Sequence, residues 1–142
     1  MIVGRDYLTS GSKQSMMLAS SMNNRFKFRV WDFTINRFDT EIYQAGEQFG
    51  HPSSCDWIAQ QYTGLTDSND NPIYEGDILM YKTGSIPTTG VIGQVLYEAD
   101  EGGYIFQWER KGPNQNYKNL NCDVAFESVI VGNKFEHSEL LN

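Results

Sequence analysis

The chain has few cysteines, few prolines and no long hydrophobic run. Its 142 residues include only two cysteines, Cys55 and Cys122, and these form no CxxC pattern, so the sequence predicts neither a zinc site nor a disulfide framework. No apolar stretch approaches the roughly 18 residues that a membrane-spanning helix needs. The N-terminus also lacks the basic start and apolar centre of a signal peptide. We therefore expect an intracellular protein with free thiols and no membrane contact.

Positive charge is scarce as well. The chain has 11 Lys and Arg against 18 Asp and Glu, and its formal net charge is −7. An acidic surface repels phosphate groups, which argues against an extensive nucleic-acid-binding surface. Aromatic residues, in contrast, make up 13% of the chain. Such a content favours a compact, strand-rich fold over a disordered chain.

The sequence contains none of the common catalytic motifs, such as GxSxG, HExxH or a P-loop. Its two histidines, His51 and His137, lie in polar, turn-like segments away from any motif cysteine or serine. The acidic residues Glu98, Asp100 and Glu101 cluster at a predicted hairpin tip, where charges are normally solvated. We therefore predict no catalytic residue, no metal ligand and no cofactor.

One polar segment resembles the start of a calcium loop. Asp67, Asn69 and Asn71 alternate like the first ligands of an EF-hand, but Pro72 stands where the loop needs glycine and Ile78 where it needs a bidentate glutamate. We predict a polar turn instead. In such a turn, Asx side chains bind the local backbone and a proline fixes the exit.

Alternation of apolar and polar residues predicts strands along most of the chain. RFKFRVWDF at 25–33 has the period of a half-buried strand, as do residues 77–82 and a hairpin at 91–110. Residues 57–65 suit a strand or a short helix, and residues 111–121 are predicted to be a loop. The last residues, HSELLN, are predicted to form a helical turn. Many short strands separated by turn residues predict a mainly β fold, either a barrel or a sandwich.

Residues 1–24 differ from the rest of the chain. They are rich in serine and methionine and contain neither tryptophan nor phenylalanine. Ser12 is a suitable N-cap for a short helix over 13–22, although so short a helix is marginal alone. We predict an N-terminal extension, helical or mobile, attached to a β domain at 25–142.

Four residues of the first predicted strand, Arg25, Lys27, Arg29 and Trp31, share one face. Basic groups can follow a phosphate backbone while an aromatic ring stacks on a base, so this stripe is the candidate binding site for single-stranded nucleic acid. The competing interpretation is that cationic residues protect an edge strand from pairing with other chains. The net charge of −7 favours the second interpretation.

Three blocks of the sequence resemble the signature of the YopX family, small proteins encoded by bacteriophages and prophages. FRVWD at 28–32 resembles the opening FRAWD, QYTGLTDSNDNPIYEGDI at 61–78 resembles QYTGLKDKNGKEIYEGDI, and VIVGNKFEHSELL at 129–141 resembles the close VIGNIYENPELL. The blocks follow the family order. The matching positions that we expect to be structural are Trp31, Asp32, Tyr62, Gly64, Tyr74, Glu75, Gly76, Asp77, Gly132 and Asn133.

The resemblance implies a fold. YopX-like domains are similar to SH3-type small barrels, so we expect a mainly β, SH3-like barrel with long loops. Gly76 is expected to turn the chain sharply before a strand that starts at Asp77. The aromatic family positions are expected in the core, and the acidic ones are expected to accept hydrogen bonds from backbone amides at turns. The aromatic positions are Trp31, Tyr62 and Tyr74. The acidic positions are Asp32, Glu75 and Asp77.

The resemblance assigns no biochemical role. We expect a non-catalytic protein of the bacterial cytoplasm that binds a protein partner or assembles with itself through aromatic residues and strand edges. The alternative is a small barrel that binds single-stranded nucleic acid through Arg25, Lys27, Arg29 and Trp31.

Overall fold

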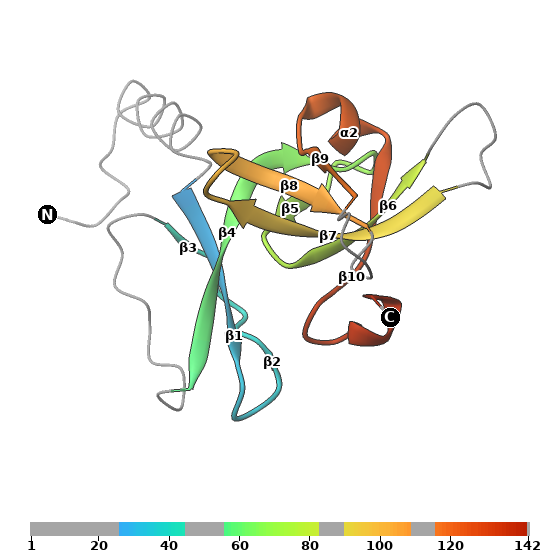
Figure 1. Cartoon of the computed structure of the whole chain (residues 1–142). Coiled ribbons are helices and arrows are strands. Elements are labelled where there is room, and N and C mark those ends of the chain that lie inside the picture. The colour runs from blue at the N-terminus through green and yellow to red at the C-terminus, as the bar shows by residue number, and fades with distance from the viewer. Residues whose placement is uncertain (1–25, 45–55, 83–89, 109–115, 142) are drawn as a thin grey trace, which may run out of the picture.

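Two antiparallel β-sheets make up the protein in a computed structural model, which describes residues 26–44, 56–82, 90–108 and 116–141 (Figure 1). The expected mainly β fold is thereby confirmed. The predicted extension at 1–24 and the residue Arg25 lie outside the described residues, as do His51 and Cys55. Within the described part of the chain, no helix has the length and apolar composition needed to cross a membrane.

The first sheet is built around β1 (Lys27–Asp32) and β4 (Trp57–Thr66), which pair antiparallel. On the far side of β4 lies β5 (Pro72–Tyr74), and on the far side of β1 lie two short strands, β2 (Arg37–Phe38) and β3 (Tyr43–Gln44). The ambiguous segment at 57–65 is thus a strand. The interpretation of β1 as an edge strand is wrong, because β1 has hydrogen-bonded neighbours on both sides.

The second sheet has the order β10–β6–β7–β8–β9 and curls like half of a barrel in Figure 1. Its strands are β6 (Asp77–Lys82), β7 (Gly90–Glu98), β8 (Gly103–Gln107), β9 (Tyr117–Asn119) and β10 (Ser128–Asn133). The predicted strand at 77–82 and the predicted hairpin are confirmed, with the turn at 99–102. The predicted loop at 111–121 is wrong in one respect, because it contains β9.

Two short helical segments complete the fold. The helix α2 (Cys122–Phe126) begins at Asn121, whose side-chain Oδ1 accepts a hydrogen bond from the amide of Val124 at 2.9 Å. The predicted C-terminal turn is η3 (Ser138–Leu141). Val124 and Ala125 of α2 complete the main hydrophobic core with buried side chains of both sheets, namely Ile73, Leu79, Val95 and Phe106.

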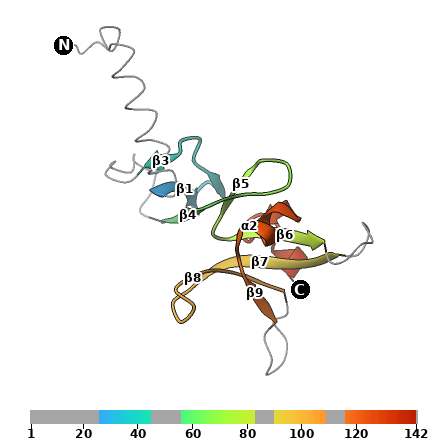
Figure 2. The same ribbon diagram turned by 90° about the horizontal axis from the view of Figure 1, so that it is seen from above.

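The two sheets lie on opposite sides of the molecule and meet where β5 leads into β6 (Figure 2). At this junction Gly76 has a φ of +88°, so the predicted sharp turn is confirmed. The Gly76 amide donates to Val95 of β7, and its carbonyl accepts from the Lys134 amide just after β10. The junction therefore joins the turn between the sheets to two further strands.

Candidate functional site

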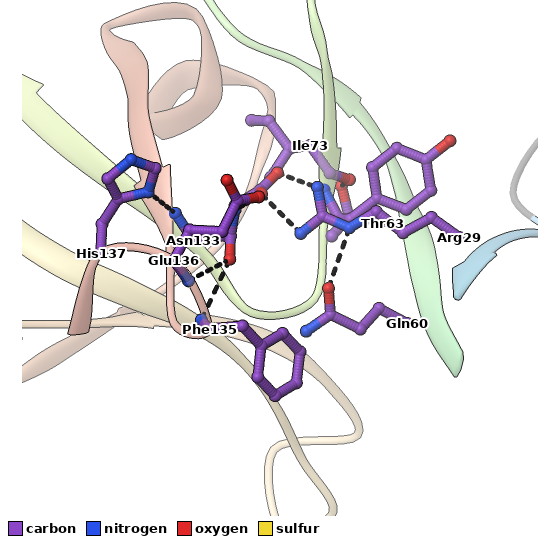
Figure 3. Close-up of polar contacts among 10 residues, drawn as sticks. Arg29, Gln60, Thr63, Ile73, Asn133, Phe135, Glu136 and His137 are labelled. Carbon is purple, nitrogen blue, oxygen red and sulfur yellow. Dashed lines mark hydrogen bonds and ion pairs between the residues drawn. The ribbon is translucent and has the colours of Figure 1, made fainter. Parts of the chain in front are cut away.

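Arg29 of β1 lies at the boundary between the two sheets. Its Nη2 is 2.7 Å from Oδ1 of Asp77, the first residue of β6, and its Nε donates to Oε1 of Gln60 on β4 at 2.9 Å (Figure 3). The rings of Phe38 and Tyr74 flank the guanidinium, with centroids 4.3 and 4.8 Å from Cζ. The arginine side chain is only 15% exposed, so this ion pair is largely shielded from water.

Asp77 uses both carboxylate oxygens within the protein. Oδ1 pairs with Arg29, and Oδ2 accepts the amide hydrogen of Tyr74 at 2.8 Å, which closes the turn between β5 and β6. Burial raises the pKa of this carboxyl above its ordinary value, while the charge of Arg29 and the hydrogen bonds oppose the rise. The carboxyl is therefore a structural group, as expected for a family acid at a turn.

The side chain of Gln60 is buried beside Gly76. Because Oε1 of Gln60 accepts from Arg29, Nε2 is turned towards Gly76, and within the described part of the chain it has no hydrogen-bond partner. A Cβ atom at position 76 would collide with this amide nitrogen. The glycine is thus required twice, for its positive φ and for the space that Gln60 occupies.

An aromatic cluster continues this boundary. Trp31 of β1 is buried and stacks on Phe135, with ring centroids 5.0 Å apart and planes 13° from parallel. Phe38 packs edge to face against Trp31, and Phe33 packs edge to face against Phe135. Tyr62 and Tyr74 are buried as well, so the expectation that the family aromatics lie in the core is confirmed. Phe135 belongs to the third family block, so the cluster joins the first block to the last.

The third block folds into a tight turn after β10. The Asn133 side-chain oxygen accepts the amide hydrogens of Phe135 and Glu136, each at 3.0 Å, and the Asn133 amide donates to Nδ1 of His137 at 3.2 Å (Figure 3). Gly132 lies against the ring of His137, where a Cβ would be too close. This turn holds Phe135 against Trp31, and it engages His137 in a structural hydrogen bond.

The polar segment at 67–71 is a turn, as predicted. Oδ1 of Asp67 accepts the amide hydrogens of Asn69 and Asn71, each at 2.9 Å. Its Oδ2 accepts the amide hydrogen of Ile130 on β10 at 3.0 Å. Asp67 therefore ties the loop between β4 and β5 to the second sheet.

The four residues of the basic stripe have different surroundings. Arg25 lies outside the described residues, and Nζ of Lys27 is 5.3 Å from the centroid of the Tyr62 ring. Arg29 and Trp31 share a face, as predicted, but that face is turned to Asp77 and Phe135. The described residues of the stripe therefore do not form an exposed row along the sheet.

The remaining family positions shape turns and strands around the boundary between the two sheets. Gly64 has a φ of +87° in β4, and the Glu75 amide donates to the carbonyl of Gln61 at 2.9 Å. Oδ1 of Asp32 accepts the amide hydrogen of Thr34 at 2.8 Å in the turn after β1. Among the described residues, no three His, Cys, Asp or Glu side chains gather into a possible metal site.

Sequence reasoning missed an exposed group of apolar residues, which we call the apolar tip. It consists of Phe33, Ile35, Trp57 and Ile58, which are 36–44% exposed. Phe33 and Ile35 lie in the turn between β1 and β2, and Trp57 is opposite Asp32 at the start of β4. Figure 1 shows this end of the first sheet extending away from the second sheet. The signal for the tip in the sequence was an apolar residue directly after the first predicted strand, Phe33, and two at the start of the segment 57–65.

Comparison with known proteins supports the fold and the family resemblance. The family model described as YopX protein matches residues 32–142. A crystal structure of protein EF1440 from Enterococcus faecalis superposes with a TM-score of 0.52 at 21% identity, over 82% of this chain and 97% of that one. No curated protein matches the sequence.

Proposed function

The chain belongs to the YopX family, and we propose that it is a non-catalytic module that binds another protein or a second copy of itself. We also propose that it is a phage or prophage accessory protein of the bacterial cytoplasm, as the family resemblance implies. The charged and amide side chains of the family blocks support a role without catalysis. Arg29, Asp67, Asp77 and Asn133 all make hydrogen bonds that hold turns and sheets together.

The apolar tip carries the proposal. Four large apolar side chains are exposed at one end of the first sheet, on both of its faces, and exposed apolar surface that is concentrated in one region marks interaction surfaces. Two of the four are aromatic, the class of side chain that is enriched at protein interfaces. The tip is also joined to the aromatic cluster, because Phe33 packs edge to face against Phe135.

Binding of single-stranded nucleic acid is the weaker candidate. It needs basic and aromatic side chains that are free to meet phosphate and base. Arg29 is held by Asp77 and Gln60, and Trp31 is buried in the aromatic cluster. The net charge of −7 further disfavours a polyanionic partner.

Size-exclusion chromatography with light scattering tests the proposal on the full chain. We compare the wild type with an Ile35→Ser/Ile58→Ser variant, which makes the tip polar. Phe126→Ser is the matched control, because Phe126 is 74% exposed but lies on α2. We expect a mass above the monomer's 16.2 kDa for the wild type and the control, and a monomer for the tip variant.

A monomeric wild type directs the test to a foreign partner. The three proteins are then used as baits in a bacterial lysate, with nuclease added. A partner that the wild type and Phe126→Ser retain and the tip variant loses supports the proposal. If neither self-association nor capture depends on the tip, the proposed function is wrong.

A further inference from the structure

The outermost strand of the second sheet, β9, has an open edge. All three of its residues are exposed, and within the described part of the chain it pairs only with β8, with Phe106 opposite Lys118. The Trp108 amide donates to the Asn116 carbonyl, and the Leu120 amide donates to the Tyr104 carbonyl. Since hydrogen-bonded and non-hydrogen-bonded pairs alternate in an antiparallel ladder, the N–H and C=O groups of Tyr117 and Asn119 point away from β8.

The opposite edge of the same sheet is covered. There β10 is contacted by the loop between β4 and β5, because the Ser68 amide donates to the Ser128 carbonyl and Asp67 accepts from the Ile130 amide. Figure 2 shows β9 at the other margin of the sheet. Among the described residues, the two margins of this sheet therefore differ, and the β9 margin is the one that offers free backbone groups for a further strand.

Natural proteins often protect an exposed edge strand by short length, by a lysine or by a proline. The strand β9 is short and carries one lysine. Lys118 stands in the middle of β9, but its Nζ is 5.2 Å from the centroid of the Tyr81 ring, so its charge lies over the face of the sheet that carries Tyr81. No proline interrupts the strand. The edge is therefore accessible to a partner's backbone.

Negative charge lies beside this edge. The turn between β7 and β8 carries Glu98, Asp100 and Glu101, and a carboxylate oxygen of Glu101 accepts the hydroxyl hydrogen of Tyr117 at 2.6 Å. A strand that pairs with β9 therefore passes close to a carboxylate. Opposite charges placed across neighbouring strands stabilise the pairing, and like charges oppose it.

A second copy of the chain fits this edge poorly. If two β9 strands paired about a twofold axis through Lys118, the two lysines would stand directly opposite each other on one face. Each copy also carries a net charge of −7. The electrostatics of the edge favour a cationic partner over a second copy.

We propose that the outer edge of β9 binds an extended segment of a partner protein that contains lysine or arginine, and that this segment adds to the second sheet as a further strand. Main-chain hydrogen bonds to Tyr117 and Asn119 supply the pairing, and Glu101 selects for positive charge. This inference rests on the proposed function only in that the partner is a protein. It concerns a different surface from the apolar tip.

The test uses the full chain and a synthetic peptide of about nine alternating valine and lysine residues, a typical strand length. The valine–glutamate peptide of equal length is its control. Amide hydrogen exchange followed by NMR is the first readout. With the lysine peptide, exchange should slow at Tyr117 and Asn119 and should change little at Lys118 and Leu120, which already face β8.

Asn119→Pro removes one outward N–H and leaves the ladder with β8 intact, a substitution that edge strands tolerate. Asn119→Ala is the matched control, because it keeps that N–H. We expect the lysine peptide to bind Asn119→Pro at least about tenfold more weakly than the wild type, because a carbonyl of the peptide loses its N–H partner. The peptide should bind Asn119→Ala as it binds the wild type. Glu101→Gln should weaken binding of the lysine peptide and reduce its preference over the glutamate peptide.

Several outcomes would overturn the inference. They are equal binding of both peptides, binding that Asn119→Pro leaves unchanged, protection confined to other strands, and self-association that only Asn119→Pro abolishes. If Asn119→Pro does not fold, amide exchange in the wild type still tests the inference, because the lysine peptide must slow exchange at Tyr117 and Asn119. The Ile35→Ser/Ile58→Ser variant should bind the lysine peptide normally, which separates this inference from the proposed function.

Discussion

Arg29 and Asp77 are 48 positions apart in the sequence, and the 2.7 Å ion pair between them joins the central strand of the first sheet to the first strand of the second. One partner comes from the first family block and the other from the second. The pair is flanked by Phe38 and Tyr74 and closes the boundary between the sheets. The first predictions concern this boundary.

Replacing Arg29 should destabilise the protein strongly. Arg29→Ala leaves Asp77 buried without its counter-ion, and we expect the free energy of unfolding to fall by about 3 kcal/mol. Urea unfolding at neutral pH measures the change. Arg37→Ala is the control, because Arg37 is exposed on the neighbouring β2 and should cost less than about 0.5 kcal/mol. Equal losses for the two variants would contradict a structural role for the ion pair.

The cost of Arg29→Ala should also depend on pH. Burial raises the pKa of Asp77 in the folded protein, so the folded state holds this proton more tightly than the unfolded chain does. The contribution of such a group to stability is present below its unfolded pKa and is lost as pH rises through its folded pKa. Without Arg29 to oppose the rise, the loss becomes larger.

We therefore expect Arg29→Ala to be less destabilising at about pH 5 than at about pH 8. Urea unfolding of the wild type and the variant at both pH values measures this difference. The double variant Arg29→Ala/Asp77→Asn has no carboxyl at this position and should lack the additional pH dependence. A loss that is the same at both pH values would show that Asp77 is not its source.

Gly76 should be intolerant of a side chain for two separable reasons. Gly76→Ala strains a residue with φ of +88° and drives its Cβ into the amide of Gln60. Gly102→Ala isolates the first effect, because Gly102 has a φ of +67° and no heavy atom near its Cβ position. We expect Gly102→Ala to cost about 1 kcal/mol and Gly76→Ala clearly more.

The extra cost at position 76 should depend on Gln60. In the double variant Gln60→Ser/Gly76→Ala the collision is absent, so its loss should be about 1 kcal/mol smaller than the sum of the two single losses. Thermal or urea unfolding of the four proteins of this cycle measures the coupling. Simple additivity would show that the collision is relieved without cost in another way.

Asp67 should act as a structural carboxylate and not as a calcium ligand. Asp67→Ala leaves three backbone amides without their acceptor, and we expect a loss of about 3 kcal/mol in urea unfolding. Asp70→Asn, in the same turn at a φ of +68° that asparagine tolerates, should be nearly neutral. Addition of calcium or of a chelator should leave the melting temperature of the wild type unchanged, and a calcium-dependent increase would contradict this role.

A labelled single-stranded oligonucleotide should show no steep, salt-dependent binding in fluorescence anisotropy, even at low salt. The reason is that Arg29 and Trp31 are engaged inside the protein. Lys27→Ala is the diagnostic variant, because Lys27 is the remaining described residue of the predicted stripe. Binding at low salt that falls with salt and is lost in Lys27→Ala would restore the nucleic-acid interpretation.

The sequence predicted most strands because their apolar residues alternate. It also predicted the turns at Gly76 and Asp67, because glycine and Asx residues are typical of turns. It did not predict β9, because Tyr117–Asn119 is a short polar strand whose three residues are all exposed. It also did not predict α2, although Asn121 before CDVAF is a suitable N-cap. A short apolar run suits a strand and a helix equally well.

The orientation of the first strand shows a further limit of sequence reasoning. Alternation placed Arg29 and Trp31 on one face, but the sequence could not reveal that this face meets Asp77 and Phe135. Such contacts join residues that are far apart in the chain, and an arginine between two aromatic rings has the same local pattern as a solvated one. Gln60 and Phe135 escaped notice for the same reason.

The stacking of Trp31 on Phe135 sets an order of events during synthesis. The ribosome makes β1 early, but the ring that covers Trp31 is added about a hundred residues later. Until then, the nascent first sheet exposes Trp31 in addition to the apolar tip. The first sheet is therefore fully packed only after β10 and the turn that follows it have been synthesised, and the earlier part must be kept from aggregating in the meantime.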